Sequence, residues 1–219
     1  DRHRADGDAR ATVQLFKLLL AKDSAKIIVK KTLDGILNIA WLNILDELPV
    51  GAGVYYVHRN NGDIVYIGKG KNIKSTVNRH FTGDSAVAKA IQKEAAFVTY
   101  EETGTMLIAA LRAHREIREN SPPYNLPANG SIPEKTARNH SYPHENMIII
   151  DKGRETGERS AFLVENNLFK GFGYFNLNHQ IKNIRILRSI ITPVEHTDEV
   201  NRIIISYLLK NRKLKIVPF

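Results

Sequence analysis

The strongest constraint on the fold of this 219-residue chain is a pair of β-branched and aromatic segments on either side of a short polar turn. The segments are Gly53–His58 and Ile64–Ile67, and Asn61-Gly62 lies between them. An Asn-Gly dipeptide favours the positive backbone dihedral angles that a tight hairpin turn requires. The pattern therefore predicts a β-hairpin, which brings Tyr55 and Tyr66 onto neighbouring strands.

Helical and strand patterns surround this hairpin. A leucine-rich helix is expected over Leu33–Leu45, and Pro49 ends it because proline disfavours helical geometry in the residue before it. A basic loop is expected over Gly68–Asn72. Apolar spacing then predicts helices at Ile73–Phe81, Ala86–Ala95 and Met106–Glu119, the last capped by Thr103 or Thr105, with a strand at Phe97–Tyr100. The fold class is α+β, with a small antiparallel sheet flanked by helices.

The last third of the chain predicts a second, smaller α+β module. Its expected elements are a strand at Met147–Ile150, a hairpin of Ala161–Glu165 and Phe169–Phe175, a helix capped by Thr197 or Asp198 that runs to Leu209, and a strand at Leu214–Val217. The aromatic run Gly171–Phe175 is either a platform for stacking bases or the core of that hairpin, and core packing is the favoured interpretation.

A polar linker, Pro127–Glu145, is expected between the two parts. His140 and His144 are the closest pair of histidines in it. Pro143 interrupts any helix between them and no third ligand is evident, so the sequence does not favour a metal site there.

Composition narrows the class of protein. Thirty-two Lys and Arg against 23 Asp and Glu give a net charge of +9, which indicates either a solvated surface or a polyanionic partner such as DNA or RNA. The absence of cysteine excludes disulfides and thiolate metal sites, and fits a cytoplasmic location. No uncharged apolar run approaches the roughly 18 residues of a membrane span, so we expect no membrane partner.

The hairpin and the segments after it resemble the GIY-YIG nuclease domain. Gly53-Val54-Tyr55 is followed, after ten residues, by Tyr66-Ile67-Gly68, and then in order by Lys71-Asn72-Ile73, His80-Phe81 and Pro122-Pro123-Tyr124-Asn125. The resemblance extends over Leu48–Leu126. It implies hydrolysis of a DNA phosphodiester with Mg²⁺ or Mn²⁺ as cofactor.

The resemblance also assigns roles to four residues. Tyr55 is the candidate base for the attacking water, and Tyr66 orients water or phosphate. Lys69 is expected to lower the pKa of Tyr55 and to neutralise phosphate charge, while Asn125 holds the substrate or the geometry of the site. Each tyrosine alone is typical of an ordinary strand aromatic. The ordered set favours a catalytic site.

Two positions depart from the family pattern. The basic helix usually carries an arginine where this chain has Thr76, and the long helix usually carries a metal-binding glutamate where it has Ala113. Arg79 and Glu116, each about one helical turn further on, are the candidate substitutes for phosphate contact and metal binding. Losing one preorganised electrostatic contact costs ~10²–10³ in rate, so we expect an impaired hydrolytic site.

Basic residues cluster beside this motif. They form either a DNA-contacting surface, whose affinity falls steeply with salt, or a solvated helix face. The candidate nucleic-acid contacts are Gly68, Lys71, Lys74, Arg79, Lys89 and Lys93.

The first residues resemble the last motif of epsilon-like 3′–5′ exonucleases. His3 and Asp8 have the spacing of that motif's general base and metal ligand, and the resemblance implies an incomplete exonuclease remnant. We therefore expect the carboxy-terminal part of an exonuclease/GIY-YIG fusion protein that acts in DNA replication or repair. Its expected segments are a remnant (1–22), a connector helix (23–46), the GIY-YIG domain (47–127), a linker (128–145) and the small module (146–219).

Two alternatives to a nuclease remain open from the sequence. One is a non-catalytic DNA-binding module, and the other is a structural tether for a replication or repair protein that contacts no nucleic acid. Salt-dependent DNA binding separates the tether from the nuclease and the DNA-binding module.

Overall fold

The computed structural model describes residues 15, 39–125 and 141–219 of a chain that divides into two compact units, 1–46 and 47–219. The expectations for His3, Asp8, His140 and most of the linker lie outside the described residues. In the described part, helix α3 (Ile39–Glu47) ends shortly before Pro49, as the sequence predicted. No helix in these described ranges is long and apolar enough to cross a membrane.

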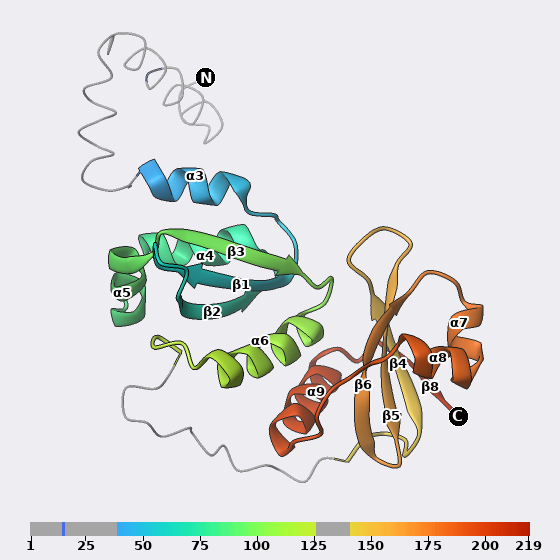
Figure 1. Ribbon diagram of the computed structural model, residues 1–219. Helices are drawn as coiled ribbons and strands as arrows, with labels where there is room; N and C mark the ends of the chain where they lie inside the picture. The colour runs from blue at the N-terminus through green and yellow to red at the C-terminus, as the bar shows by residue number, and fades with distance from the viewer. Residues whose placement is uncertain (1–14, 16–38, 126–140) are drawn as a thin grey trace, which may run out of the picture. The chain divides into compact units, whose positions relative to one another are not determined.

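The predicted hairpin forms two strands of a three-stranded antiparallel sheet in the order β2-β1-β3 (Figure 1). Its strands are β1 (Gly53–His58), β2 (Ile64–Gly70) and β3 (Phe97–Glu102). Gly62 has a φ of +90° in the turn. Tyr55 pairs with Gly68, and Val57 pairs with Tyr66, so both tyrosine side chains lie on the same face of the sheet.

The sequence placed the end of β2 too early. The expected loop begins at Gly68, but β2 continues through Lys69 and Gly70. Lys69 and Gly70 pair with Val54 and Gly53 of the central strand, so their backbone groups have ladder partners that propensity alone does not reveal.

Three helices cover this sheet, with α4 (Ile73–Thr82) and α5 (Ala86–Glu94) on one side and α6 (Met106–Asn120) on the other (Figure 1). A polar side chain caps each helix by accepting a hydrogen bond from a backbone N–H of the first turn. The capping residues are Asn72, Ser85 and Thr105.

The second sheet has five strands in the order β7-β6-β5-β4-β8. The strands are β4 (Met147–Lys152), β5 (Arg159–Glu165), β6 (Leu168–Phe175), β7 (Thr192–Pro193) and β8 (Lys215–Pro218), with helix α9 (Asp198–Lys210) on one face. Asn166 and Asn167 take positive φ angles of 53° and 57° in the β5–β6 turn. Thr197 is the N-cap of α9, one of the two predicted candidates.

The sequence missed α7 (His179–Lys182), α8 (Ile184–Ile190) and the short strand β7. These elements are too short to show a clear apolar period. They depend on packing against the sheet, where Leu187 is fully buried beside Phe175.

Helix α6 is buried on two sides and belongs to both cores. Ala109 and Ala113 pack against Val54 and Ile67 of the first sheet. From the same helix, apolar side chains enter a larger core with β4, β5, β6 and α9; they are Leu107, Ile108 and Leu111. This shared helix makes residues 47–219 one compact unit.

A close backbone approach also joins the two sheets. Gly104, in the β3–α6 turn, has a φ of +70°, and a Cβ atom there would overlap the carbonyl group of Gly153 in the β4–β5 turn. Beside it, the Tyr174 hydroxyl donates a 3.1 Å hydrogen bond to the Thr103 carbonyl.

We expect Gly104→Ala to destabilise the chain by more than the ~1–2 kcal/mol of left-handed backbone strain alone, because the methyl group also collides with Gly153. Gly62→Ala is the matched control, since Gly62 has a φ of +90° but a Cβ atom added there would meet no atom within 4 Å. Urea unfolding measures both free energies. Equal losses in the two variants would contradict the close approach.

Candidate functional site

The site is built around Tyr55, whose ring lies directly over Gly68 of the neighbouring strand. A Cβ atom at Gly68 would overlap the phenol ring and hydroxyl of Tyr55. The glycine of the Tyr66-Ile67-Gly68 motif is therefore needed here for steric reasons. Its expected contact with nucleic acid stays a prediction.

Tyr55, Tyr66 and His80 form one aromatic cluster. The Tyr55 hydroxyl lies 2.7 Å from Nε2 of His80, the two tyrosine rings are 6.2 Å apart between centroids, and the Tyr66 and His80 rings meet edge to face at 4.9 Å. Tyr55 is 1% exposed, whereas Tyr66 and His80 are half-buried. Solvent therefore reaches Tyr66 more readily than Tyr55.

His80 is the member of this cluster to which the sequence analysis gave no role. The sequence feature that could have indicated its position is the apolar spacing of α4, in which Ile73, Val77 and Phe81 are buried. A residue seven positions after Ile73 lies on that same helix face, toward the sheet. Helical periodicity could thus have placed His80 beside the tyrosines.

The electrostatics of the cluster favour neutral groups. Burial, followed by interaction with Tyr66, raises the pKa of the Tyr55 phenol well above its ordinary value, and burial also raises the pKa of Tyr66. Burial and then the Arg79 charge lower the pKa of His80. Near neutral pH the cluster therefore holds two protonated phenols and an uncharged imidazole.

The expected effect of Lys69 on Tyr55 is wrong. The pKa of Tyr55 is raised, and the cation that acts to lower it is Arg79. Side chains alternate along a strand, so Lys69 lies on the opposite face from Tyr66 and Gly68. There it lines a groove with the first turn of α6, and desolvation lowers the pKa of its ammonium group.

Arg79 and Thr76 interact on α4. The Thr76 hydroxyl donates to the Asn72 carbonyl at 2.8 Å and accepts a 3.2 Å hydrogen bond from Nη2 of Arg79. The Arg79 guanidinium therefore reaches back one turn to the position where the family pattern has its arginine. This geometry supports Arg79 as the candidate phosphate contact.

Asn125 holds the outer edge of β2. Its side-chain oxygen accepts the Ile67 N–H at 2.7 Å, and its amide nitrogen donates to the Ile67 carbonyl at 2.8 Å. The neighbouring Tyr124 N–H adds a 3.1 Å bond to the Val65 carbonyl. These bonds support the expected role of Asn125 in holding the geometry of the strand that carries Tyr66, and its expected contact with substrate stays a prediction.

The described residues do not fit a divalent cation at the place where the family pattern has glutamate. Ala113 is 1% exposed, packs against Val54 and Ile67, and offers no oxygen. The Glu116 carboxylate accepts a 2.8 Å bond from Arg115. Burial, followed by the charge of Glu116, raises the pKa of Tyr56 on the α6 side of the sheet. Within the described ranges no three His, Cys, Asp or Glu residues gather to hold a metal.

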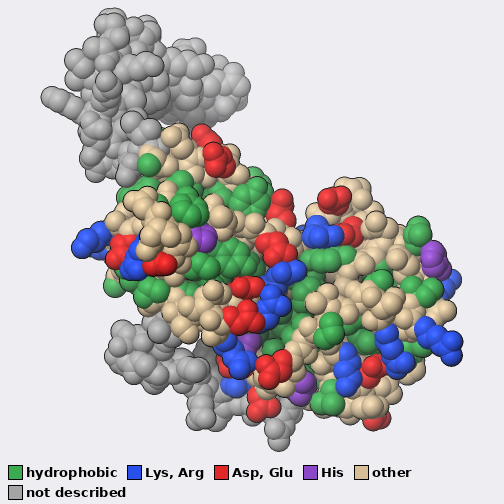
Figure 2. Space-filling view, viewed as in Figure 1, with side chains coloured by type: hydrophobic (Ala, Val, Ile, Leu, Met, Phe, Trp, Pro, Cys, Tyr) green, Lys and Arg blue, Asp and Glu red, His purple; other side chains and the backbone are tan. Residues whose placement is uncertain are grey.

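The remaining predicted nucleic-acid contacts are dispersed. Lys71 joins Lys69 at the groove beside α6, whereas Lys89 and Lys93 are exposed on α5, with Lys89 3.9 Å from Asp84. Lys74 is half-buried in the first turn of α4. Figure 2 shows basic and acidic side chains interspersed over the viewed face. The positive net charge is therefore not gathered into one uniformly basic surface.

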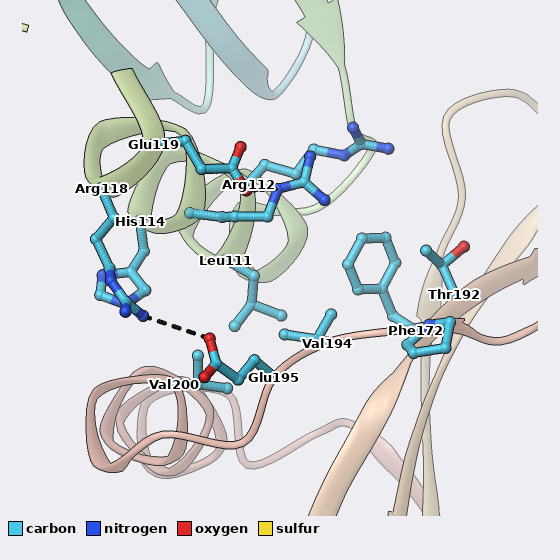
Figure 3. Close-up of a pocket in the computed structure, with 12 residues that line it drawn as sticks. Leu111, Arg112, His114, Arg118, Glu119, Phe172, Thr192, Val194, Glu195 and Val200 are labelled. Carbon is cyan, nitrogen blue, oxygen red and sulfur yellow. Dashed lines mark ion pairs between the residues drawn. The ribbon is translucent and has the colours of Figure 1, made fainter. Parts of the chain in front are cut away.

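A separate cavity of about 360 Å³ lies between α6 and the second sheet (Figure 3). Phe172, from the candidate stacking platform, lines it but is only 5% exposed and packs with Phe162, which agrees with the favoured core interpretation. The three arginines of the cavity are each paired with a carboxylate: Arg112 with Glu101, Arg115 with Glu116 and Arg118 with Glu195. The cavity therefore offers little unneutralised charge for an anion.

Comparison with known proteins identifies the class of domain. Residues 51–126 match the family model of the UvrC-like GIY-YIG domain. The chain is 32% identical over 116 residues to UvrABC system protein C of Streptococcus gordonii, and 34% identical over the same length to that of Streptococcus mutans. The alignment covers 52% of this chain and 19% of each relative, about a fifth of its length.

Among solved structures, the chain is similar to the GIY-YIG N-terminal endonuclease domain of UvrC from Thermotoga maritima bound to magnesium. The identity is 21% and the TM-score 0.37, covering 39% of this chain and 94% of that domain. The family match shows that residues 51–126 are a GIY-YIG domain of the UvrC-like type, as the motif indicated. It does not extend to the expected exonuclease remnant or the fusion, which stay predictions.

The lowered pKa of His80 predicts a pH-dependent stability. A histidine whose pKa is lower in the folded state stabilises the fold above its unfolded pKa of about 6.5, and this contribution is lost as the pH falls through the folded value. Between pH 7 and pH 5 the wild-type chain should therefore lose more unfolding free energy than His80→Gln. Urea unfolding at both pH values measures this, and an equal loss would contradict the neutral imidazole.

The two hydrogen bonds between Asn125 and Ile67 predict that removing this side chain lowers the free energy of unfolding. Asn125→Ala breaks two hydrogen bonds to Ile67, and we expect a loss of about 1–3 kcal/mol in unfolding free energy. Asn61→Ala is the control, because the two bonds that Asn61 makes to Asp63 lie in an exposed turn. Similar losses for the two variants would show that the bonds to Ile67 stabilise the fold no more than an exposed turn contact does.

Proposed function

We propose that this chain acts on DNA in repair, and that its GIY-YIG domain holds a DNA phosphodiester at the Tyr66 side of the first sheet. The observation that carries this proposal is the 2.7 Å contact between the Tyr55 hydroxyl and His80 Nε2, beside a second, more accessible phenol. A neutral imidazole that contacts one phenol, beside a second phenol and an arginine, is an arrangement suited to general-base hydrolysis.

The geometry suggests how protons move. Tyr66 meets the attacking water or the phosphate, since it is the phenol that solvent reaches. Tyr55, which hydrogen-bonds to neutral His80, passes its proton to Nε2 as it receives one from the Tyr66 side. Arg79 neutralises charge on the phosphate oxygens, and Asn125 keeps β2 in register.

The extent of cleavage is a separate question from binding. The Thr76 hydroxyl is bonded to the helix backbone, and Ala113 lies in an apolar cluster, so neither replaces the charged residue of the family pattern. With each missing contact worth ~10²–10³ in rate, we propose that hydrolysis is impaired. The buried Ala113 is also the observation that favours the second candidate, a DNA-binding module without catalysis.

The UvrC-like family match supports repair proteins as partners. The curated relatives are components of a UvrABC system, and the matched segment is a small part of each. The expected role in replication and the expected link to an exonuclease rest only on the resemblance of residues 1–22 to the last motif of epsilon-like exonucleases.

Restoring the two family residues is the most direct test. We expect Thr76→Arg/Ala113→Glu to raise the nicking of supercoiled plasmid in Mg²⁺ or Mn²⁺ by at least ~10²-fold over the unmodified chain. Thr76→Arg/Ala113→Gln is the matched control, because glutamine has the size of glutamate without its charge. Adding Tyr55→Phe or Tyr66→Phe to the restored variant should remove the gain.

Circular dichroism shows whether each variant folds, since position 113 is buried. A folded Thr76→Arg/Ala113→Glu chain without added nicking would contradict the assigned site. A gain that survives both tyrosine substitutions would contradict their roles.

A further inference from the structure

A basic groove lies beside the first turn of α6 and one face of α9. Its volume is about 910 Å³, and its lining comes from β2, the β3–α6 turn, the end of β4 and one face of α9. The apolar and small residues near α6, among them Met106, Leu107 and Ala110, form one wall. Charged and uncharged polar side chains of β2, β4 and α9 form much of the rest.

The lining of this groove is strongly positive. Five basic side chains face two acidic ones, a net charge of +3: Lys69, Lys71, Lys152, Arg202 and Lys210 against Asp151 and Glu199. The Tyr207 hydroxyl donates a 2.6 Å hydrogen bond to the Asp151 carboxylate, so this acidic side chain already has a partner within the protein. The lining therefore keeps a formal excess of positive charge.

Helix α9 presents a regular polar edge to the groove. Arg202, Ser206 and Lys210 follow one another at four-residue intervals, so they lie on one helix face over about 12 Å. One strand of DNA rises about 3.4 Å per nucleotide, so this edge follows three to four nucleotides. On its other side the groove is lined by Lys69, which follows Tyr66 by three residues along β2 and lies on the opposite face of the sheet.

We propose that this groove binds the sugar–phosphate backbone of one DNA strand, on the face of the first sheet opposite the phosphodiester held at Tyr66. This inference rests on the proposed function and assigns residues 146–219 a role: they extend the substrate surface beyond the GIY-YIG domain. Recognition is through phosphate charge, so binding in the groove is independent of base sequence and steeply salt-dependent.

The test compares two variants that each remove three positive charges from the second sheet's elements. Lys152→Gln/Arg202→Gln/Lys210→Gln alters the groove, while Arg159→Gln/Lys182→Gln/Arg185→Gln alters exposed residues that do not line it. None of the six belongs to the Tyr55 site. Fluorescence anisotropy measures the binding of a labelled single strand and its duplex by the full chain over a series of salt concentrations, with thermal unfolding as a folding check.

For the groove variant we expect a loss of affinity on the order of 100-fold near 0.1 M salt and a salt slope smaller by about 2–3, since each phosphate contact contributes about 0.7–0.9. The control variant should retain nearly the wild-type slope. Equal effects of the two variants, in a chain that binds DNA, would overturn the groove and leave the proposed function standing. A wild-type chain that does not bind DNA would overturn both.

Discussion

The burial of α6 on two sides is the constraint on which the rest of the structure depends. Small alanines let the helix approach the first sheet, while leucine and isoleucine on its other flank complete the core of the second sheet. The same packing accounts for Ala113, because its side chain faces Val54 and Ile67 rather than solvent. Where the family pattern has a metal-binding carboxylate, this chain has a methyl group that belongs to the core.

On the opposite face of the first sheet, a second constraint shapes the chemistry. Gly68 makes room for the Tyr55 ring, and the ring then lies out of water against His80. Burial raises the pKa of the phenol and lowers that of the imidazole, so both groups stay neutral and the hydrogen bond between them can carry a proton. Charge at this site comes from Arg79, one turn from the expected position.

The two hollows beside α6 show why net charge alone does not identify a binding surface. Both are lined by basic residues, but in one the arginines are neutralised by nearby carboxylates. In the other, Lys69, Lys71 and basic residues of α9 line a groove whose side chains carry a net charge of +3.

The sequence by itself determined the features that depend on neighbouring residues: the Asn61-Gly62 hairpin, the caps at Thr105 and Thr197, the Asn166-Asn167 turn and the ordered GIY-YIG motif. Tertiary structure decided the rest. The continuation of β2 needed partners on β1, α7 and α8 needed a sheet to pack on, and the place of His80 beside Tyr55 needed α4 laid across the strands. The face that Lys69 occupies followed from that longer strand. Local propensity encodes turns and caps within a few residues, whereas burial, strand partners and pKa shifts arise from residues far apart in the chain.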